Sequence, residues 1–400
     1  MPTLTPTGIH SFPAIERVRF GQPAAAAVAV EAAQAGAQRV FLMASRTLNT
    51  RTEAIREIEA ALGARHAGTY DGMPQHTTRS GVSRAALAAQ QAGADLVVAV
   101  GGGSVIDGAK MVTLCLRHGM TDEHLEALDR FEVKLGDDGK PVRPVFDGPT
   151  VRMVAVPSTL NGGEFNAGCL VTDERRRHKQ TFFHIHMMPR AIVLDPVLTL
   201  HTPETLWLGS ATRALDHAIE ALLSVTPTPL ADAVVLSGIA RMAAVLPKWQ
   251  AAPHDLALRA ECQIASWLCS YGLSSRGAQG GVMMGPSHAI GHVLGGTCGV
   301  PHYHCTPVLM PAVLRWSEGA TADRQRLLAQ ALGQPELSAS EAFARLVASL
   351  GLPANLRAVG VDESRFDEIA RISMHEIFTR GNARQITTPA DVREIFALAA

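Results

Sequence analysis

Short apolar runs alternate with amphipathic segments along the first half of the chain. An extended entry is expected at 17–21, a short strand near 66–70, and apolar runs of strand length lie at 39–44, 95–100, 151–156 and 191–196. Segments rich in Ala, at 23–35, 51–62 and 81–92, have helical spacing. Strands that alternate with helices form a parallel sheet covered on both faces. The pattern therefore predicts an α/β domain.

The pattern changes after residue 196. Thr202 is a good N-cap, Pro203 suits the first helical position, and almost everything beyond them has helical period. Helices are predicted at 203–224, 230–247, 255–273, 284–294, 305–317, 321–332, 339–350, 363–373 and 389–398. We therefore predict two domains, an α/β nucleotide-binding domain at 1–198 and an all-helical domain at 199–400.

Composition narrows the class of protein. The chain has 400 residues, 47% of them hydrophobic and 18% charged, with a net charge of −1, which fits a soluble globular protein and argues against nucleic acid as a partner. The six cysteines form no C-x-x-C pair, which favours a reducing, cytoplasmic compartment. The first residues resemble no leader, and no run of about 18 apolar residues predicts a membrane span.

A glycine-rich loop follows the strand at 95–100. In Gly101-Gly102-Gly103-Ser104, exposed backbone N–H groups at a helix start suit a phosphate, with Asp107 one turn further on. The loop matches neither G-x-G-x-x-G nor the Walker pattern. The alternative is a turn that only permits tight packing of the helix on the strand.

Three other segments are candidates for the ligand-binding site or for the surface of the protein. The loop at 157–165 again places small and hydroxyl residues after a strand, where open α/β sheets bind ligands. The basic run at 175–179 is more often a solvated surface, although Lys179 is close enough to the loop to reach a phosphate or ribose. Residues 131–148, with turn chemistry at 136–141, predict an exposed hairpin or loop of ordinary surface character.

The stretch 285–304 concentrates histidines. His288 and His292 are four apart, so they share one helix face, and His302 and His304 follow. His217 lies on another predicted helix. Histidines on facing helices form a metal site or a proton-transfer site, or else they simply satisfy hydrogen bonds in a polar seam.

Taken in order, the motifs GGGSVIDGAK, PSTLNGGEF, AIVLDP, ALDHAIEALLS and SHAIGHVLGG resemble the iron-containing (group III) alcohol dehydrogenase family. The resemblance covers about residues 15–395. It implies the dehydroquinate synthase-like architecture, with a parallel-sheet domain before an all-α domain. Phe20-Gly21, Gln75-His76-Thr77 and Pro301-His302 are similar to the maleylacetate reductase branch.

The resemblance also implies a cofactor, NAD(H) or NADP(H). Its pyrophosphate would lie on Gly102, Gly103 and Ser104, with Asp107 nearby, and its nicotinamide half would contact Thr159 and Lys179. Members that prefer NAD often carry an Asp after the first strand; here Ser45 holds that position and Arg46 follows. A neutral residue beside a cation suits a 2′-phosphate, so we lean towards NADPH or tolerance of both.

The metal position departs from the family. In that family, a divalent iron or zinc ion is held by an Asp and a His four residues apart and by two further histidines fourteen residues apart. In this chain His217, His288 and His302 match the three histidines, but Arg213 stands at the position of the Asp. A guanidinium cannot ligate and would repel the ion by several kcal/mol at intermediate dielectric. Asp216 could substitute only if the helix rotated. Arg213 instead suits a substrate carboxylate, or forms an ion pair with Asp216 or Glu220.

We therefore predict a cytoplasmic, homodimeric NAD(P)H-dependent oxidoreductase acting on a small carboxylate-bearing molecule. His292 would supply the proton and Arg213 would hold a substrate carboxylate. His217, His288 and His302 would polarise the substrate oxygen directly, or hold a metal that does so. Three alternatives stay open: an iron- or zinc-dependent alcohol dehydrogenase, an NAD-using lyase or cyclase of the dehydroquinate synthase type, and a non-catalytic cofactor-binding protein.

Overall fold

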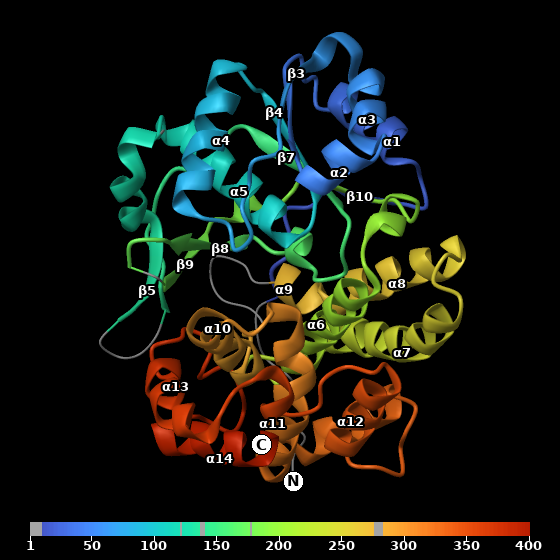
Figure 1. Ribbon diagram of the computed structural model, residues 1–400, viewed down its shortest axis with the longest axis vertical. Coiled ribbons are helices and arrows are strands. Elements are labelled where there is room, and N and C mark those ends of the chain that lie inside the picture. Colours follow the sequence, from blue (N-terminus) through green and yellow to red (C-terminus); the bar gives the residue numbers. More distant parts are fainter. Residues whose placement is uncertain (1–9, 121, 137–140, 177, 276–282) are drawn as a thin grey trace.

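The computed structural model describes residues 10–120, 122–136, 141–176, 178–275 and 283–400. Figure 1 shows one half that contains the strands and their helices, and a second half built of helices alone. This is the predicted fold class, a parallel-sheet domain followed by an all-helical one. The residue boundary at 198/199 stays a prediction. The first nine residues, the middle of the predicted turn at 136–141 and Arg177 lie outside the described residues.

Six parallel strands form the main sheet, in the order β1-β10-β7-β4-β2-β3. Their bounds are β1 Arg17–Phe20, β2 Val40–Ala44, β3 His66–Tyr70, β4 Leu96–Gly101, β7 Arg152–Pro157 and β10 Ala191–Leu194. Every residue of β2, β4 and β10 is buried, as expected for strands covered on both faces. The carboxyl ends of β4 and β7 lie side by side, with Gly101 opposite Pro157.

Helices cover this sheet on both faces. They are α1 Ala24–Gln34, α2 Arg46–Arg51, α3 Ala54–Leu62, α4 Arg79–Gln91 and α5 Gly103–His118. The helix predicted at 51–62 corresponds to α3, and α2 before it was not predicted; the chain at Thr52 is extended between the two. One apolar cluster fills the space beneath α1 and α3, and a second fills the space beneath α4 and α5.

A second sheet, which is antiparallel, corrects two sequence predictions. Its order is β6-β5-β9-β8, with bounds β5 Glu132–Leu135, β6 Pro141–Val142, β8 Gly168–Asp173 and β9 His178–Phe183. The segment 131–148 is thus not merely surface material, because Val133 pairs with Thr181 and is buried. The basic run at 175–179 is a hairpin tip whose Arg175 and Arg176 are exposed, whereas Lys179 already belongs to β9.

The second half consists of helices around one large apolar cluster and one smaller one. Their bounds are α6 Glu204–Leu222, α7 Pro229–Ala251, α8 Leu256–Cys269, α9 Tyr271–Ser274, α10 Pro286–Cys298, α11 His302–Ala331, α12 Ala339–Ser349, α13 Phe366–Ser373 and α14 Pro389–Ala399. Two predicted helices, at 305–317 and 321–332, are joined in α11, with a non-helical residue at Thr321. The other helices agree with the prediction to within a few residues.

Helix α7 is, among the described residues, the one helix long and apolar enough to cross a membrane by length and composition. It packs against α6 and α8, and its inward residues Val235, Ile239 and Met242 are fully buried in the larger apolar cluster. A helix in the core of a helical domain can be as long and as apolar as a membrane-spanning helix, and the contacts of α7 are those of such a core helix.

Candidate active site

A cavity of about 790 Å³ lies between the two halves of the molecule. The carboxyl ends of β2, β4 and β7, the antiparallel sheet, and helices α6, α10 and α11 contribute its walls. Every site residue predicted from the sequence lines it: Ser45, Gly102, Gly103, Ser104, Asp107, Thr159, Lys179, Arg213, His217, His288, His292 and His302. Their individual roles stay predictions. Cys298 and His304, which border the histidine stretch, are not among the lining residues.

The glycine loop forms one end of this cavity. Helix α5 begins at Gly103 with Gly102 as its N-cap, directly after β4. Gly101 has φ of +154°, and a Cβ added at Gly103 would lie 2.7 Å from the Asn161 amide nitrogen. Larger residues would therefore close the space above the helix start. Backbone N–H groups and the helix dipole at this position suit an anion.

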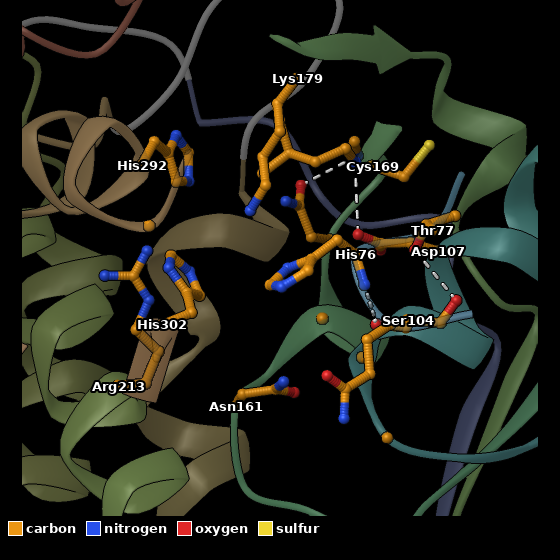
Figure 2. Close-up of a pocket in the computed structure, with 18 of the residues that line it drawn as sticks. His76, Thr77, Ser104, Asp107, Asn161, Cys169, Lys179, Arg213, His292 and His302 are labelled. Carbon is orange, nitrogen blue, oxygen red and sulfur yellow. Dashed lines mark hydrogen bonds between the residues drawn. The ribbon is translucent and has the colours of Figure 1, made fainter. Parts of the chain in front are cut away.

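The segment before α4 packs on that helix start. The backbone N–H of His76 donates to the Ser104 hydroxyl at 3.1 Å, and the Thr77 hydroxyl donates to the Ser104 carbonyl at 3.1 Å. Both residues have left-handed backbone, with φ of 67° at His76 and 49° at Thr77. Such strain in non-glycine residues costs about 1–3 kcal/mol each and is concentrated at functional sites. Figure 2 shows the His76 ring pointing into the cavity.

Ser45 and Arg46 occupy the turn after β2. The Ser45 backbone N–H donates to Val100 at 2.8 Å, which fixes the turn beside the glycine loop, and Ser45 is the N-cap of α2. Arg46 is exposed and lines the cavity. An exposed cation in this turn of a dinucleotide-binding sheet is a residue type that can pair with a 2′-phosphate.

The buried side chain of Lys110 holds the helix that follows the glycine loop in place. The Lys110 ammonium donates to the carbonyls of Gly163 and Gly168 at 2.7 and 2.8 Å, and lies 3.6 Å from the Asp107 carboxylate. Asp107 also accepts from the Leu170 backbone N–H at 3.2 Å. Burial raises the pKa of Asp107, and it raises the pKa of the neighbouring Glu164 to about 7. These contacts tie α5 to the 157–165 loop and to the antiparallel sheet.

Histidine rings from α6, α10 and α11 form the other end of the cavity. The centroids of His217 and His288 are 4.9 Å apart, those of His288 and His292 are 5.2 Å apart, and those of His292 and His302 are 5.4 Å apart. Burial, with Arg213 as the next cause, holds the pKa values of His288 and His302 well below the usual range. The imidazoles of these two residues are therefore neutral near pH 7. Nε2 of His292 and Nδ1 of His302 are buried without a hydrogen-bond partner among the described residues.

Arg213 reaches the same end from α6. Its guanidinium donates to Asp216 at 2.6 Å and to the Thr306 hydroxyl at 3.3 Å, so the ion pair considered from the sequence is present. Arg213 nonetheless lines the cavity, and its Nη2 is buried without a hydrogen-bond partner among the described residues. Both proposed functions of Arg213 are therefore compatible, since one nitrogen holds Asp216 and the other has no hydrogen-bond partner among the described residues.

These residues do not fit the family's metal site. The guanidinium of Arg213 stands where a carboxylate would ligate, and Asp216 is bonded to it and to Nδ1 of His288 at 3.1 Å. The rings of His288 and His302 are 6.4 Å apart, whereas imidazoles sharing a tetrahedral zinc have centroids roughly 5 Å apart. Glu220 is engaged as well, because its two oxygens accept from the backbone N–H groups of Gly285 and His288.

Lys179 faces this cluster from β9 (Figure 2). Burial lowers the pKa of its ammonium, and the nearby Arg213 lowers it further. Of the described residues that line the cavity, Arg46, Arg143, Lys179 and Arg213 are cationic and only Asp107 is acidic. The cavity thus provides an excess of positive charge for anionic ligands.

Several lining residues were not assigned a role from the sequence. His76 entered only through the family resemblance, and Asn161 only as part of a loop. Arg143 belongs to a segment judged to be surface material, yet it lines the cavity. Glu376 does not line the cavity, but its carboxylate lies 3.4 Å from Nδ1 of His292; it comes from beyond α13 and had no signal in the sequence.

A glycine-rich loop at the strand ends of a parallel sheet, opening on a cleft between domains, is typical of enzymes that bind a nucleotide or dinucleotide. Comparison with known proteins supports this class. Residues 15–196 match the family described as iron-containing alcohol dehydrogenase, and residues 209–400 match the C-terminal part of the Fe-containing alcohol dehydrogenase family. The chain belongs to the iron-containing alcohol dehydrogenase family, and it is an NAD(P)-dependent oxidoreductase.

Individual relatives agree with the branch indicated by the motifs. The maleylacetate reductase of Pseudomonas sp. strain P51 is 28% identical over 366 residues, covering 92% of this chain and 91% of that protein. The dehydrogenase FUM7 of Gibberella moniliformis is 28% identical over 401 residues, covering 91% and 92%. The maleylacetate reductase structure from Agrobacterium tumefaciens has a TM-score of 0.80 at 25% identity, covering 99% of this chain and 98% of that one. The chain is thus maleylacetate reductase-like, which confirms the resemblance.

Proposed function

We propose that this enzyme reduces a carboxylate-bearing oxo-acid, with maleylacetate as the reference substrate, and that Arg213 binds a substrate carboxylate. The observation that carries the proposal is the buried Arg213 guanidinium in the cavity wall, with Nη2 unpartnered among the described residues. A fixed, planar donor fork suits a carboxylate better than it suits a plain alcohol. The similarity to maleylacetate reductases supports the same substrate class.

In this proposal the cofactor crosses the cavity from the glycine loop to the histidines. The pyrophosphate lies on Gly102, Gly103 and Ser104 at the start of α5, and Thr159 and Lys179 contact the nicotinamide half. The exposed Arg46 beside Ser45 favours NADPH through its 2′-phosphate, without excluding NADH. When bound, NAD(P)H supplies the hydride; the protein's contribution is to position and polarise the substrate.

The proton comes from His292 in our proposal. Its Nδ1 lies 3.4 Å from Glu376, whose carboxylate favours the doubly protonated ring. The buried Nε2, which has no hydrogen-bond partner among the described residues, then donates its proton to the substrate oxygen and leaves a neutral imidazole with the proton on Nδ1. Burial lowers the pKa of His292 and Glu376 opposes that effect. His217 and Arg213 would stabilise the negative charge that develops on the substrate oxygen or on the adjacent carboxylate.

No step is assigned to a metal, since the side chains at the family's ligand positions do not fit one. One observation favours the alternative, an iron- or zinc-dependent alcohol dehydrogenase. Asp216, Glu220 and His288 place one ligand atom each within 4.8 Å of one another, and all three are buried. Their atoms are already bonded to Arg213 and to the start of α10, so an ion would have to displace those bonds.

The test combines elemental analysis with turnover. Protein purified without added metal is assayed for NADPH and NADH oxidation by maleylacetate, before and after chelation. Metal near zero with chelator-resistant turnover is expected. About one iron or zinc per chain, with activity lost on chelation, would establish the metal-dependent alternative. Tightly retained NAD without net oxidation by any carbonyl substrate would point to the lyase or cyclase class.

Arg213 is tested by Arg213→Met combined with Asp216→Asn, which removes the buried pair together and so avoids an unpaired charge. We expect kcat/KM for maleylacetate to fall on the order of 100-fold, the value of a charged hydrogen-bond pair. Arg241→Gln, which breaks an exposed ion pair with Glu261 on α7 and α8, is the matched control. Unchanged turnover in the double variant would refute the role of Arg213.

We infer a homodimer in the cytoplasm. The six cysteines are free thiols, five of them buried, which is compatible with a reducing compartment. Size-exclusion chromatography with light scattering measures the assembly directly, and a monomeric mass would refute the dimer.

A further inference from the structure

Two consecutive residues before α4 have a left-handed backbone although neither is glycine. The φ angles of His76 and Thr77 are 67° and 49°, and such backbone persists only where the surrounding structure fixes it. Ser104, at the start of α5, accepts the His76 N–H and the Thr77 hydroxyl from one side. From the other side, Thr172 of β8 donates its hydroxyl to the His76 carbonyl and its backbone N–H to the Thr77 carbonyl, both at 2.8 Å. The turn is therefore fixed between α5 and the antiparallel sheet.

This constraint decides where the His76 side chain points. Thr77 is 2% exposed and its hydroxyl is bonded to Ser104, whereas His76 is exposed and lines the cavity. Figure 2 shows the His76 ring directed into the cavity. The hydrogen bonds of His76 to other described residues are made by its backbone, so its ring is open to a ligand. Glycine would adopt the same backbone without strain. A histidine at this position therefore indicates a function of the side chain.

Lys179 lies close to the His76 ring. It is paired with Thr172 across the antiparallel sheet, and residues paired in this way have their side chains on the same face. Burial lowers the pKa of His76 and the Lys179 ammonium lowers it further, so the ring is neutral near pH 7. Burial is also the first cause that lowers the pKa values of His292 and His302, to which Lys179 again contributes. Lys179 is therefore near both His76 and the histidine end of the cavity.

We propose that His76 binds the cofactor, by a hydrogen bond between its ring and a hydroxyl of the ribose that carries the nicotinamide. The inference rests on the proposed function for the direction of the cofactor, with its pyrophosphate at the glycine loop and its nicotinamide towards the histidines. His76 is bonded to Ser104 at the loop and lies near Lys179, which faces the histidines. The ribose that links the pyrophosphate to the nicotinamide has to pass this point.

The chemistry of the two side chains matches a ribose diol. A neutral imidazole offers one donor and one acceptor, and an ammonium offers donors only. One ribose hydroxyl therefore accepts from Lys179 while its neighbour forms a hydrogen bond with His76. The pyrophosphate has acceptors only, and the backbone N–H groups at the start of α5 suit it better. His76 thus recognises the sugar and not the phosphates.

The test measures the binding of cofactor fragments by calorimetry and needs no turnover. ADP ends at the second phosphate and ADP-ribose adds the ribose; both carry the adenosine 2′-phosphate if wild type binds NADPH more tightly than NADH. In His76→Gly the Kd for ADP-ribose should rise roughly 5- to 10-fold, the value of one net hydrogen bond, and the Kd for ADP should stay within about twofold of wild type. Equal rises for both fragments, no rise for either, or wild type that binds ADP-ribose no more tightly than ADP, would overturn the proposal.

The stability of the same variant distinguishes a binding role from a structural one. Glycine suits a φ of 67° better than histidine does, so the Tm of His76→Gly should equal or exceed that of wild type. A lower Tm with unchanged Kd values would make His76 a structural residue and refute the proposal. His76→Asn, which also tolerates a left-handed backbone and keeps a polar side chain, should recover part of the affinity.

His254→Gly is the matched control, because it removes an exposed histidine in the turn between α7 and α8 that is not among the cavity's lining residues. It should bind both fragments as wild type does. Maleylacetate does not enter these titrations, so failure of wild type to reduce it would refute only the proposed substrate. Maleylacetate turnover by wild type, together with unchanged ADP-ribose binding in His76→Gly, would leave the proposed function standing and refute the role of His76.

Discussion

The two ends of the cavity are built in different ways. The end at the glycine loop, here called the phosphate end because we propose that the pyrophosphate binds there, is made by backbone from one continuous segment, in which β4 leads through Gly101 and Gly102 into α5. The histidine end is made by side chains from α6, α10, α11 and the segment after α13. A backbone site tolerates changes of side chain but not added volume. A site made of side chains is sensitive to the charge of each of them. Here an arginine in place of a carboxylate changes which ligands the histidine end can bind.

The largest effect should come from the proton donor at the histidine end. His292→Asn keeps a polar group of similar reach but removes acid–base chemistry, so kcat should fall about 10²- to 10⁴-fold. NADPH binding, measured by fluorescence titration, should be unchanged because the glycine loop is intact. A kcat within a few-fold of wild type would show that another group supplies the proton.

The next largest effect should come from a larger side chain in the glycine loop, which would weaken cofactor binding. Gly103→Ala places a methyl group 2.7 Å from the Asn161 amide and should raise the Kd for NADPH about 10-fold, since a well-positioned phosphate contact is worth about 1.5 kcal/mol. Gly296→Ala on α10, where an added Cβ meets nothing within 4 Å, is the control. Equal Kd values for the two variants would contradict a close approach of the cofactor to Gly103.

A smaller, selective effect is expected at the turn after β2. Arg46→Gln should raise KM for NADPH several-fold, about 1 kcal/mol for an exposed charge pair, and leave KM for NADH unchanged. Arg51→Gln, another exposed arginine on α2, provides the comparison. If both cofactors respond equally, Arg46 contacts no 2′-phosphate.

The buried Glu164, which lies beneath the glycine loop, should make the free energy of unfolding depend on pH. Burial raises the pKa of Glu164 from 4.5 to about 7, so between these values the native state keeps a proton that the unfolded state has lost. The free energy of unfolding therefore falls as pH rises through this window, by about 2–3 kcal/mol. Glu164→Gln should remove that fall and raise the Tm at pH 8, while exposed Glu363→Gln should not. An unchanged pH profile of Tm would refute the shift.

The local sequence predicted those structural features that are formed by one continuous segment of the chain. The buried strands at 95–100 and 151–156, the glycines after them and the helical second half all follow from periodicity and backbone chemistry, which are local properties. The residues lining the cavity on these segments were accordingly found. Strands β8 and β9 were missed, because their polar, charged hairpin has the composition of a surface and its pairing with β5 is non-local.

The sequence by itself determined the two-part architecture, the phosphate-binding loop, the set of histidines and the replacement of a ligand by Arg213. Tertiary structure decided which of these charges are paired. It placed Arg213 against Asp216, Glu220 on the start of α10, Glu376 on His292, and Arg143 over Phe183 in the cavity wall. The reason is physical: the strength of a charge depends on burial and on partners distant in the chain, and neither is encoded in local spacing.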